Sequence, residues 1–195
     1  MRRALYLFAV VIVGAVSTAS AQARARIAAR LDIQDAPPNL LVHISDLLED
    51  PVWLDALRNA YKIRVHWRVQ LWRSRTLFDD PQLPLEWDDI IQQVPVLDVY
   101  TYTEPGGSTP MITRFDTLDL LKEWVRQDVR LNTPANLTAG RWYYVVAATI
   151  STVAPDQANN PDAGGLSETL RRLILGGGPR QDLPRAKTAY FTIRR

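Results

Sequence analysis

The residues best suited to binding chemistry lie on one alternating stretch of the sequence. Arg64, His66, Arg68 and Gln70 occupy its even positions, and Trp72 continues the series. The odd positions are apolar, and alternation with period two is typical of a half-buried strand, so the polar side chains project from one face. Arginine and aromatic side chains are common in binding hot spots. The stretch therefore predicts a binding face.

Two tyrosines extend this candidate face if a second strand lies beside the first. A strand is expected over 94–104, and burial of Leu97 and Val99 would place Tyr100 and Tyr102 on its outer side. Arginines can then stack on the tyrosine rings across the strands. The opposite register would bury both tyrosines, and a solvated sheet face with ordinary cross-strand pairs is the simplest alternative. The candidate binding residues are Arg64, His66, Arg68, Trp72, Tyr100 and Tyr102.

Catalytic and cofactor motifs are missing from the sequence. It contains no Gly-x-Ser-x-Gly elbow, no phosphate-binding loop, no dinucleotide fingerprint and no cysteine. The absence of cysteine excludes disulfides, thiolate metal sites and a cysteine nucleophile. His43 lies in an apolar strand pattern, and His66 lies between two arginines. We therefore expect a protein without enzymatic activity, cofactor or metal.

Acidic residues leave one catalytic alternative open. Asp79 and Asp80 lie on one side of a proline-containing loop, and Glu86, Asp88 and Asp89 lie on the other. Two carboxyl groups about 5–10 Å apart with separated pKa values can hydrolyse glycosides. Solvated acids and turn caps are the ordinary interpretation of such clusters. A hydrolase that uses these acidic loops is kept as an alternative.

The first 21 residues have the pattern of an export signal. Two arginines follow Met1, an apolar run follows them, and small residues precede Gln22. The run is shorter than the roughly 20 residues that a membrane-spanning helix needs, so a retained N-terminal anchor is the alternative. We predict a signal peptide over 1–21, export to the periplasm, and cleavage at a site formed by Ala19, Ala21 and Gln22.

Charge argues against a nucleic-acid partner. The formal net charge of +2 is carried by Arg2 and Arg3 within the predicted signal, so the mature chain is close to neutral. Nucleic-acid-binding domains are typically basic. A protein of the cell envelope is the expected partner, and a membrane is expected only if the signal is retained as an anchor.

Strand patterns dominate the remaining chain, 22–195, which is long enough for one domain with a sizeable core. The turn-forming residues of Glu104–Ser108 predict a hairpin between the strands that flank them. Strands are expected over 27–33, 40–44, 63–71, 94–104, 111–115, 141–153 and 186–194.

Three short helices are expected in the connections between strands. Asp50, either Asp116 or Thr117, and Ser167 are suited to begin them. The Pro- and Gly-rich segment around 154–166 is predicted to be a mobile loop. The predicted fold is mainly β, an antiparallel two-layer sandwich. An immunoglobulin-like topology is expected, although the Cys…Trp…Cys signature of antibody domains is absent.

Several hydrophobic motifs resemble those of an exported bacterial family, domain of unknown function 4390. They are the Ile63–Trp72 strand with its Leu-Trp-Arg ending, Phe115–Leu118 leading into Trp124-Val125, and Leu137–Tyr144. The resemblance covers roughly 26–153. It implies an envelope protein of a family often encoded beside a membrane sensor histidine kinase. No activity or site residue is established for the family, so none is carried over.

These observations favour an exported, non-enzymatic protein-interaction module. The resemblance makes the sensory domain of a membrane kinase a candidate partner. A glycan-binding module that uses Trp72, Tyr100 and Tyr102 is an alternative from another class, and the hydrolase is a third.

Overall fold

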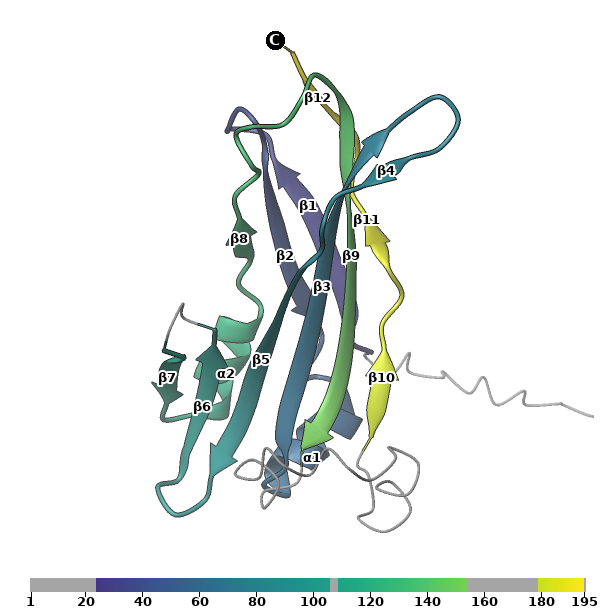
Figure 1. Cartoon of the computed structure of the whole chain (residues 1–195). Coiled ribbons are helices and arrows are strands. Elements are labelled where there is room, and N and C mark those ends of the chain that lie inside the picture. Colours follow the sequence, from purple (N-terminus) through teal and green to yellow (C-terminus); the bar gives the residue numbers. More distant parts are fainter. Residues whose placement is uncertain (1–23, 106–108, 154–178, 195) are drawn as a thin grey trace, which may run out of the picture.

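A computed structural model describes residues 24–105, 109–153 and 179–194, and these residues form two antiparallel sheets packed against each other (Figure 1). The small sheet has the order β1-β2-β8, with β1 at Arg26–Asp32, β2 at Asn39–Ser45 and β8 at Val129–Leu131. The predicted signal, the helix expected from Ser167 and the loop around 154–166 lie outside the described residues.

The large sheet has the main order β10-β9-β3-β5-β6-β7, and β4, β11 and β12 extend it. Its strands are β3 (Lys62–Ser74), β4 (Asp80–Pro81), β5 (Leu85–Val94), β6 (Val99–Glu104), β7 (Met111–Phe115), β9 (Gly140–Val153), β10 (Arg180–Asp182), β11 (Ala186–Lys187) and β12 (Phe191–Ile193).

β3 is the central strand of the large sheet and pairs with β5 on one side and β9 on the other. Its odd-numbered residues from Ile63 to Leu71 are all buried, and its even-numbered residues are half-buried or exposed. This confirms the alternation predicted from the sequence. The odd residues face the small sheet, so the polar positions lie on the outer face.

The core lies between the two sheets. Leu40, Val42 and Ile44 of β2 belong to the same buried cluster as Val65 of β3 and Ile150 of β9. Burial of each such side chain contributes about 1.5–3 kcal/mol relative to exposure. The mainly β, two-layer architecture is therefore as predicted. The division into nine and three strands differs from the four and three of a constant-type immunoglobulin domain, and the immunoglobulin-like topology stays a prediction.

Two short helices begin where the sequence predicts. α1 (Pro51–Arg58) is capped by the Asp50 carboxylate, which accepts a hydrogen bond from the Val52 N–H, and α2 (Leu118–Val125) is capped by Thr117. Each helix buries an apolar face. α1 packs against β3 and β5, and α2 packs against β6 and β7. Within the described ranges, neither helix is long and apolar enough to cross a membrane.

Two strand predictions are wrong in their bounds. The strand expected over 186–194 divides into β11 and β12, with residues 188–190 outside any strand. The segment expected as a single strand over 94–104 is split by a turn, because β5 ends at Val94 and β6 begins at Val99. The Leu97 N–H donates to the Val94 carbonyl, and Asp98 adopts a left-handed φ of 49°. Leu97 therefore lies exposed in a hairpin turn. The ten residues of β5, for most of which no strand was predicted, form a strand beside β3.

Candidate functional site

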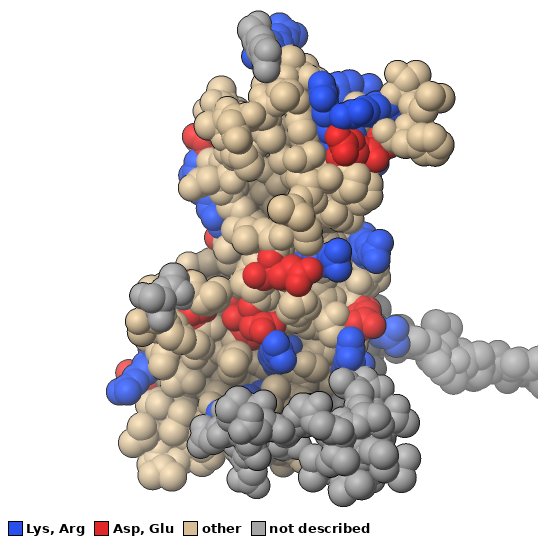
Figure 2. Space-filling model, viewed as in Figure 1, with Lys and Arg blue, Asp and Glu red and all other residues tan. Residues whose placement is uncertain are grey.

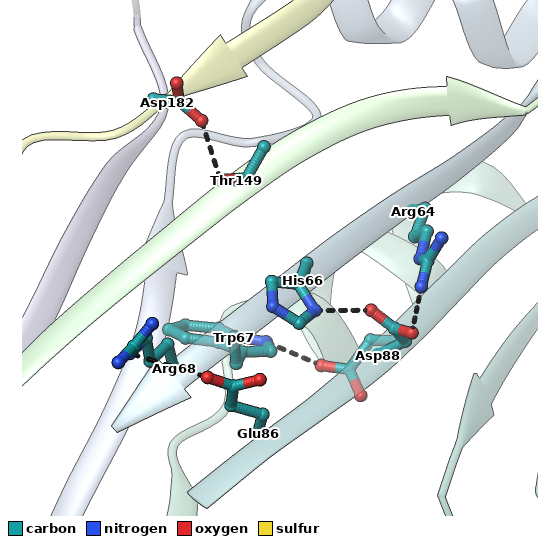
Figure 3. A network of polar contacts seen from close by, with 9 residues as sticks. Arg64, His66, Trp67, Arg68, Glu86, Asp88, Thr149 and Asp182 are labelled. Carbon is teal, nitrogen blue, oxygen red and sulfur yellow. Dashed lines mark hydrogen bonds and ion pairs between the residues drawn. The ribbon is translucent and has the colours of Figure 1, made fainter. Parts of the chain in front are cut away.

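The polar side chains of β3 are paired with acids of β5 on the outer face of the large sheet (Figure 3). His66 Nδ1 lies 2.9 Å from an Asp88 oxygen, and Arg64 donates a hydrogen bond to the other oxygen of the same carboxylate. Arg68 Nε lies 3.4 Å from Glu86. Two arginine ion pairs and the contact between His66 and Asp88 therefore form a ladder of polar contacts with the neighbouring strand.

This pairing accounts for the charge state of Asp88. Partial burial alone would raise the pKa of its carboxyl group, but the hydrogen bonds and charges of Arg64 and His66 outweigh burial and hold that pKa below its ordinary value. Half-exposed ion pairs of this kind contribute little stability. Because the arginines already have partners, this part of the face carries little free charge for a ligand.

The two tyrosines of the predicted binding face lie on the opposite side of the sheet. Tyr102 pairs with Ile91 on the core-facing side and is 8% exposed, and Tyr100 packs against the core. Their predicted outward orientation is wrong, because β6 starts after the turn and takes the register that directs both rings toward the core. Trp72 stays on the outer face with Arg64, His66 and Arg68. The six residues therefore do not form one exposed platform.

The acidic residues considered for a hydrolase lie in different surroundings. Glu86 and Asp88 point outward from β5, and Asp89 points to the opposite face because successive residues alternate along a strand. Asp79 accepts a 2.6 Å hydrogen bond from the Tyr143 hydroxyl, and Asp80 is paired with Arg75 at 2.7 Å. Among the described residues, no group of three His, Asp or Glu side chains could hold a metal ion.

Asp89 occupies a polar pocket in the core-facing side of the large sheet. It is 3% exposed, accepts a 2.8 Å hydrogen bond from the Trp67 indole, and is also hydrogen-bonded by Tyr102 and Trp87. Burial raises the pKa of its carboxyl group to about 6, and the nearby Glu104 charge acts in the same direction against the lowering effect of the hydrogen bonds. Burial, followed by the Asp89 charge, raises the pKa of the Tyr102 hydroxyl.

Asp89 also lines a cavity of about 390 Å³ between the two sheets. The cavity walls come from β2 and β8 of the small sheet, from β3, β5, β6 and β7 of the large sheet, and from the end of α2 and the segment after it. The lining residues are His43, Ile44, Leu47, Val65, Trp67, Asp89, Ile91, Tyr102, Glu104, Met111, Trp124, Val125, Gln127, Asp128, Val129 and Arg130.

A second charged group forms the opposite wall of this cavity. His43 Nδ1 lies 2.8 Å from Asp128, which also accepts a 2.5 Å hydrogen bond from Arg30. Burial by itself would raise the pKa of the Asp128 carboxyl group, but the bonds from Arg30 and His43 hold it below its ordinary value. Because the Asp128 carboxylate contacts both His43 and Arg30, the acidic and basic side chains on this wall are already paired with one another.

An aromatic and cationic cluster lies on the outer face, at the end of the sheet where β3 continues into β4. Trp72 stacks on Tyr143 with ring centroids 6.3 Å apart, and Tyr190 meets Tyr143 edge-on at 5.1 Å. The Lys187 ammonium lies 3.8 Å from the Tyr143 ring centroid, and the Arg141 guanidinium lies 4.5 Å from that of Tyr190. Of the predicted face, only Trp72 takes part. The others come from β9 and the last described segment, which sequence spacing does not connect to β3.

The loop between β3 and β4 projects beyond this cluster, at the upper right of Figure 1. Leu77 and Phe78 of this loop are both 85% exposed, and we call these two residues the apolar tip. Figure 2 shows an uncharged projection there, with acidic and basic side chains at its base. Exposed large apolar side chains are common singly, but two adjacent ones on a projecting hairpin are typical of an interaction site.

Comparison of the chain with protein-family models, curated proteins and solved structures finds no match. The family resemblance described above therefore stays a prediction, and the functional argument depends on the geometry.

Proposed function

We propose that this protein is an exported, non-enzymatic module of the cell envelope that binds a partner protein through its apolar tip. The observation that carries the proposal is the 85% exposure of both Leu77 and Phe78 at the end of a projecting hairpin. Transfer of exposed apolar and aromatic side chains out of water is favourable, so their burial by a partner contributes strongly to the free energy of binding. The tip, rather than the ion-paired face of β3, is the surface best suited to this role.

The base of the hairpin supports the proposal, because it holds the tip in a defined position. The Tyr143 hydroxyl of β9 donates to Asp79, the residue directly after Phe78, and Asp79 also accepts from the Arg75 backbone N–H. β4 closes the hairpin by pairing Pro81 with Trp72. A surface held in its bound conformation loses less entropy on association.

The charges beside the tip favour a protein partner over a lipid surface. Asp79 and Asp80 follow Phe78 directly, and the Tyr143 hydroxyl followed by the Arg75 backbone N–H holds the pKa of Asp79 below its ordinary value. Anionic lipid surfaces attract basic segments and repel carboxylates. Because Arg75 is paired with Asp80, the base of the tip carries charges of both signs rather than a basic patch for lipid headgroups. Such a tip is suited to an apolar pocket with a polar rim on a protein.

The cellular location and the partner in this proposal are inferred from the sequence. Residues 1–21 have the pattern of a cleaved signal, which supports a periplasmic location, and a retained N-terminal anchor is the alternative. The resemblance to the exported family supports the sensory domain of a membrane kinase as a partner. A glycan-binding function loses its support, because Trp72 lies on the face opposite to Tyr100 and Tyr102.

Site-specific photo-crosslinking in the native host tests the proposal. A photoreactive phenylalanine analogue at position 78 should give a discrete protein adduct, and Leu77→Ser in the same chain should weaken it. The matched control carries the analogue at Ile33, an apolar residue just after β1 that is 84% exposed and has no exposed large apolar residue beside it. Adducts of equal yield from both positions, or none from position 78, would contradict the proposal.

A further inference from the structure

The cavity between the sheets is not used by the proposed protein-binding role. Its volume of about 390 Å³ lies within the range of sites that enclose small organic molecules. Small-molecule sites combine mainly apolar walls with a few polar groups that orient the ligand. The question is which chemical class the lining selects.

The walls supply apolar and aromatic surface. Trp67 of β3, Tyr102 of β6 and Trp124 of α2 contribute rings, and Ile44 and Val129 on the small-sheet side are among the aliphatic lining residues. Aromatic rings attract cations through their quadrupole, most strongly where water is excluded. The lining therefore suits a ligand with an apolar body, and it is compatible with a positive charge.

Two acids on neighbouring strands give the cavity its charge. β5 and β6 are antiparallel, and Ile90 pairs with Thr103. The next residue along each strand in this register places Asp89 opposite Glu104, and both side chains lie on the same face of the sheet. The Glu104 charge acts on the Asp89 carboxyl group, and both residues line the cavity. Neither acid forms an ion pair with a basic side chain of the described part of the chain.

The basic groups of the cavity are already engaged on the opposite wall. The His43 ring nitrogen contacts Asp128 at 2.8 Å, so this side chain already has an acidic partner. Arg130 is hydrogen-bonded to Asp35 and lies 3.6 Å from Asp32. The cavity therefore contains two acids without a counter-ion and no uncommitted cation among its described lining residues. Burial of an unpaired carboxylate is unfavourable, and a bound cation would relieve it.

We propose that this cavity binds a small organic cation, an amine with an apolar body. Its ammonium group lies between Asp89 and Glu104, and its body packs against Trp67, Trp124 and the aliphatic wall. An inorganic metal ion is a poor alternative, because the described residues provide no group of three suitable ligands. The ammonium group needs only acceptors and ring faces, and both are present here.

A matched ligand series on the mature protein tests the charge requirement. The probes are 2-phenylethylamine, 2-phenylethanol and 3-phenylpropanoate, which share an apolar body and differ in charge. Calorimetric titration at about pH 8 should give an amine affinity at least about tenfold above that of the alcohol, and weaker binding still for the carboxylate. The Trp67 and Trp124 indole resonances should shift on addition of the amine.

Two matched variants assign the site. Glu104→Gln should lower the amine affinity about tenfold, because it removes one charge and keeps the side-chain shape. Glu86→Gln on the outer face of β5 should leave that affinity unchanged. Equal binding of the amine and the alcohol, tighter binding of the carboxylate, or no amine binding at millimolar concentration would each overturn the proposal. Leu77→Ser should not alter amine binding, so this result is separable from the fate of the protein-binding proposal.

Discussion

The Trp67 indole donates a 2.8 Å hydrogen bond to the Asp89 carboxylate inside the space between the sheets. This contact depends on the pairing of β3 with β5, which places Val65 opposite Asp89 and Trp67 opposite Trp87. The two indole rings stack with centroids 5.6 Å apart. One step back along β5, Asp88 faces outward and pairs with Arg64 and His66. Two consecutive aspartates thus have pKa values shifted in opposite directions.

The first prediction concerns stability against pH. Burial raises the pKa of Asp89 from its ordinary value of 3.8 to about 6 in the folded protein, so the folded state binds this proton more tightly than the unfolded state does. The Asp89 contribution to the free energy of unfolding therefore falls as pH rises from about 4 to 6 and is constant above that range. The shift corresponds to about 3 kcal/mol.

Asp89→Asn removes this titration. We expect the variant to be more stable than the wild type at about pH 8, by about 1–3 kcal/mol, and to show no such gain near pH 4. Urea unfolding followed across this pH range provides the measurement. Asp88→Asn is the matched control, and it should lower stability at neutral pH by less than about 1 kcal/mol. A constant difference between Asp89→Asn and the wild type at all pH values would refute the buried ionisation.

The second prediction is the pH dependence of amine binding. Deprotonation of Asp89 adds a negative charge to the cavity, so the affinity for 2-phenylethylamine should rise as pH increases through about 6. The other titratable or charged groups lining the cavity are Glu104, Tyr102, His43, Asp128 and Arg130. Calorimetric titration at several pH values between about 5 and 8 gives the profile. The rise should disappear in Asp89→Asn, and its persistence there would assign it to another of these groups.

The sequence predicts much of the large sheet because β3 obeys strict alternation. Every odd position from Ile63 to Leu71 is apolar, and each of these residues is buried. β5 does not follow the same rule, because Asp89 occupies a core-facing position where the pattern expects an apolar residue. The apolar alternation is therefore interrupted in β5, and the strand was missed.

The candidate site was harder to predict than the fold. The cavity combines residues from both sheets and from α2, and their juxtaposition depends on the packing of the layers rather than on spacing within one segment. The prediction for Tyr102 was wrong because a strand's two faces exchange when its register shifts by one residue. The local sequence pattern does not indicate how far Phe78 of the apolar tip projects into solvent.

The third prediction compares the two helix caps. Asp50 is 6% exposed and accepts from the Val52 N–H, whereas Thr117 accepts from Leu120 at an exposed helix start. Replacing Asp50 removes both an acceptor and buried side-chain atoms, whereas water can replace the exposed Thr117 hydroxyl. Asp50→Ala should therefore cost about 1–2 kcal/mol and Thr117→Ala about 0.5–1 kcal/mol in urea unfolding.

The control for the caps lies within α1. Asp55 is 3.9 Å from Arg58, and both side chains are largely exposed. Asp55→Ala should change the free energy of unfolding by less than about 0.5 kcal/mol. If Asp55→Ala cost as much as Asp50→Ala, the capping interpretation would be wrong, because loss of any acid in this helix would then have the same effect.

The fourth prediction separates function from stability at the apolar tip. Leu77 and Phe78 are 85% exposed, so replacing both by serine removes almost no buried apolar surface and should change the free energy of unfolding by less than about 0.5 kcal/mol. Phe191, which is 8% exposed and stacks on Tyr144, is the matched buried position. Phe191→Ser should cost about 3–5 kcal/mol.

Thermal and urea unfolding of the two variants provide the measurement, and adduct formation from a crosslinker placed next to the tip provides the functional readout. The tip variant should fold like the wild type and lose its adduct. If the substitutions leave stability unchanged and abolish the adduct, the two apolar side chains contribute to partner binding rather than to folding. A large loss of stability in the tip variant would instead show that Leu77 and Phe78 pack against the protein's own surface, and it would remove the basis for proposing the tip as a binding site.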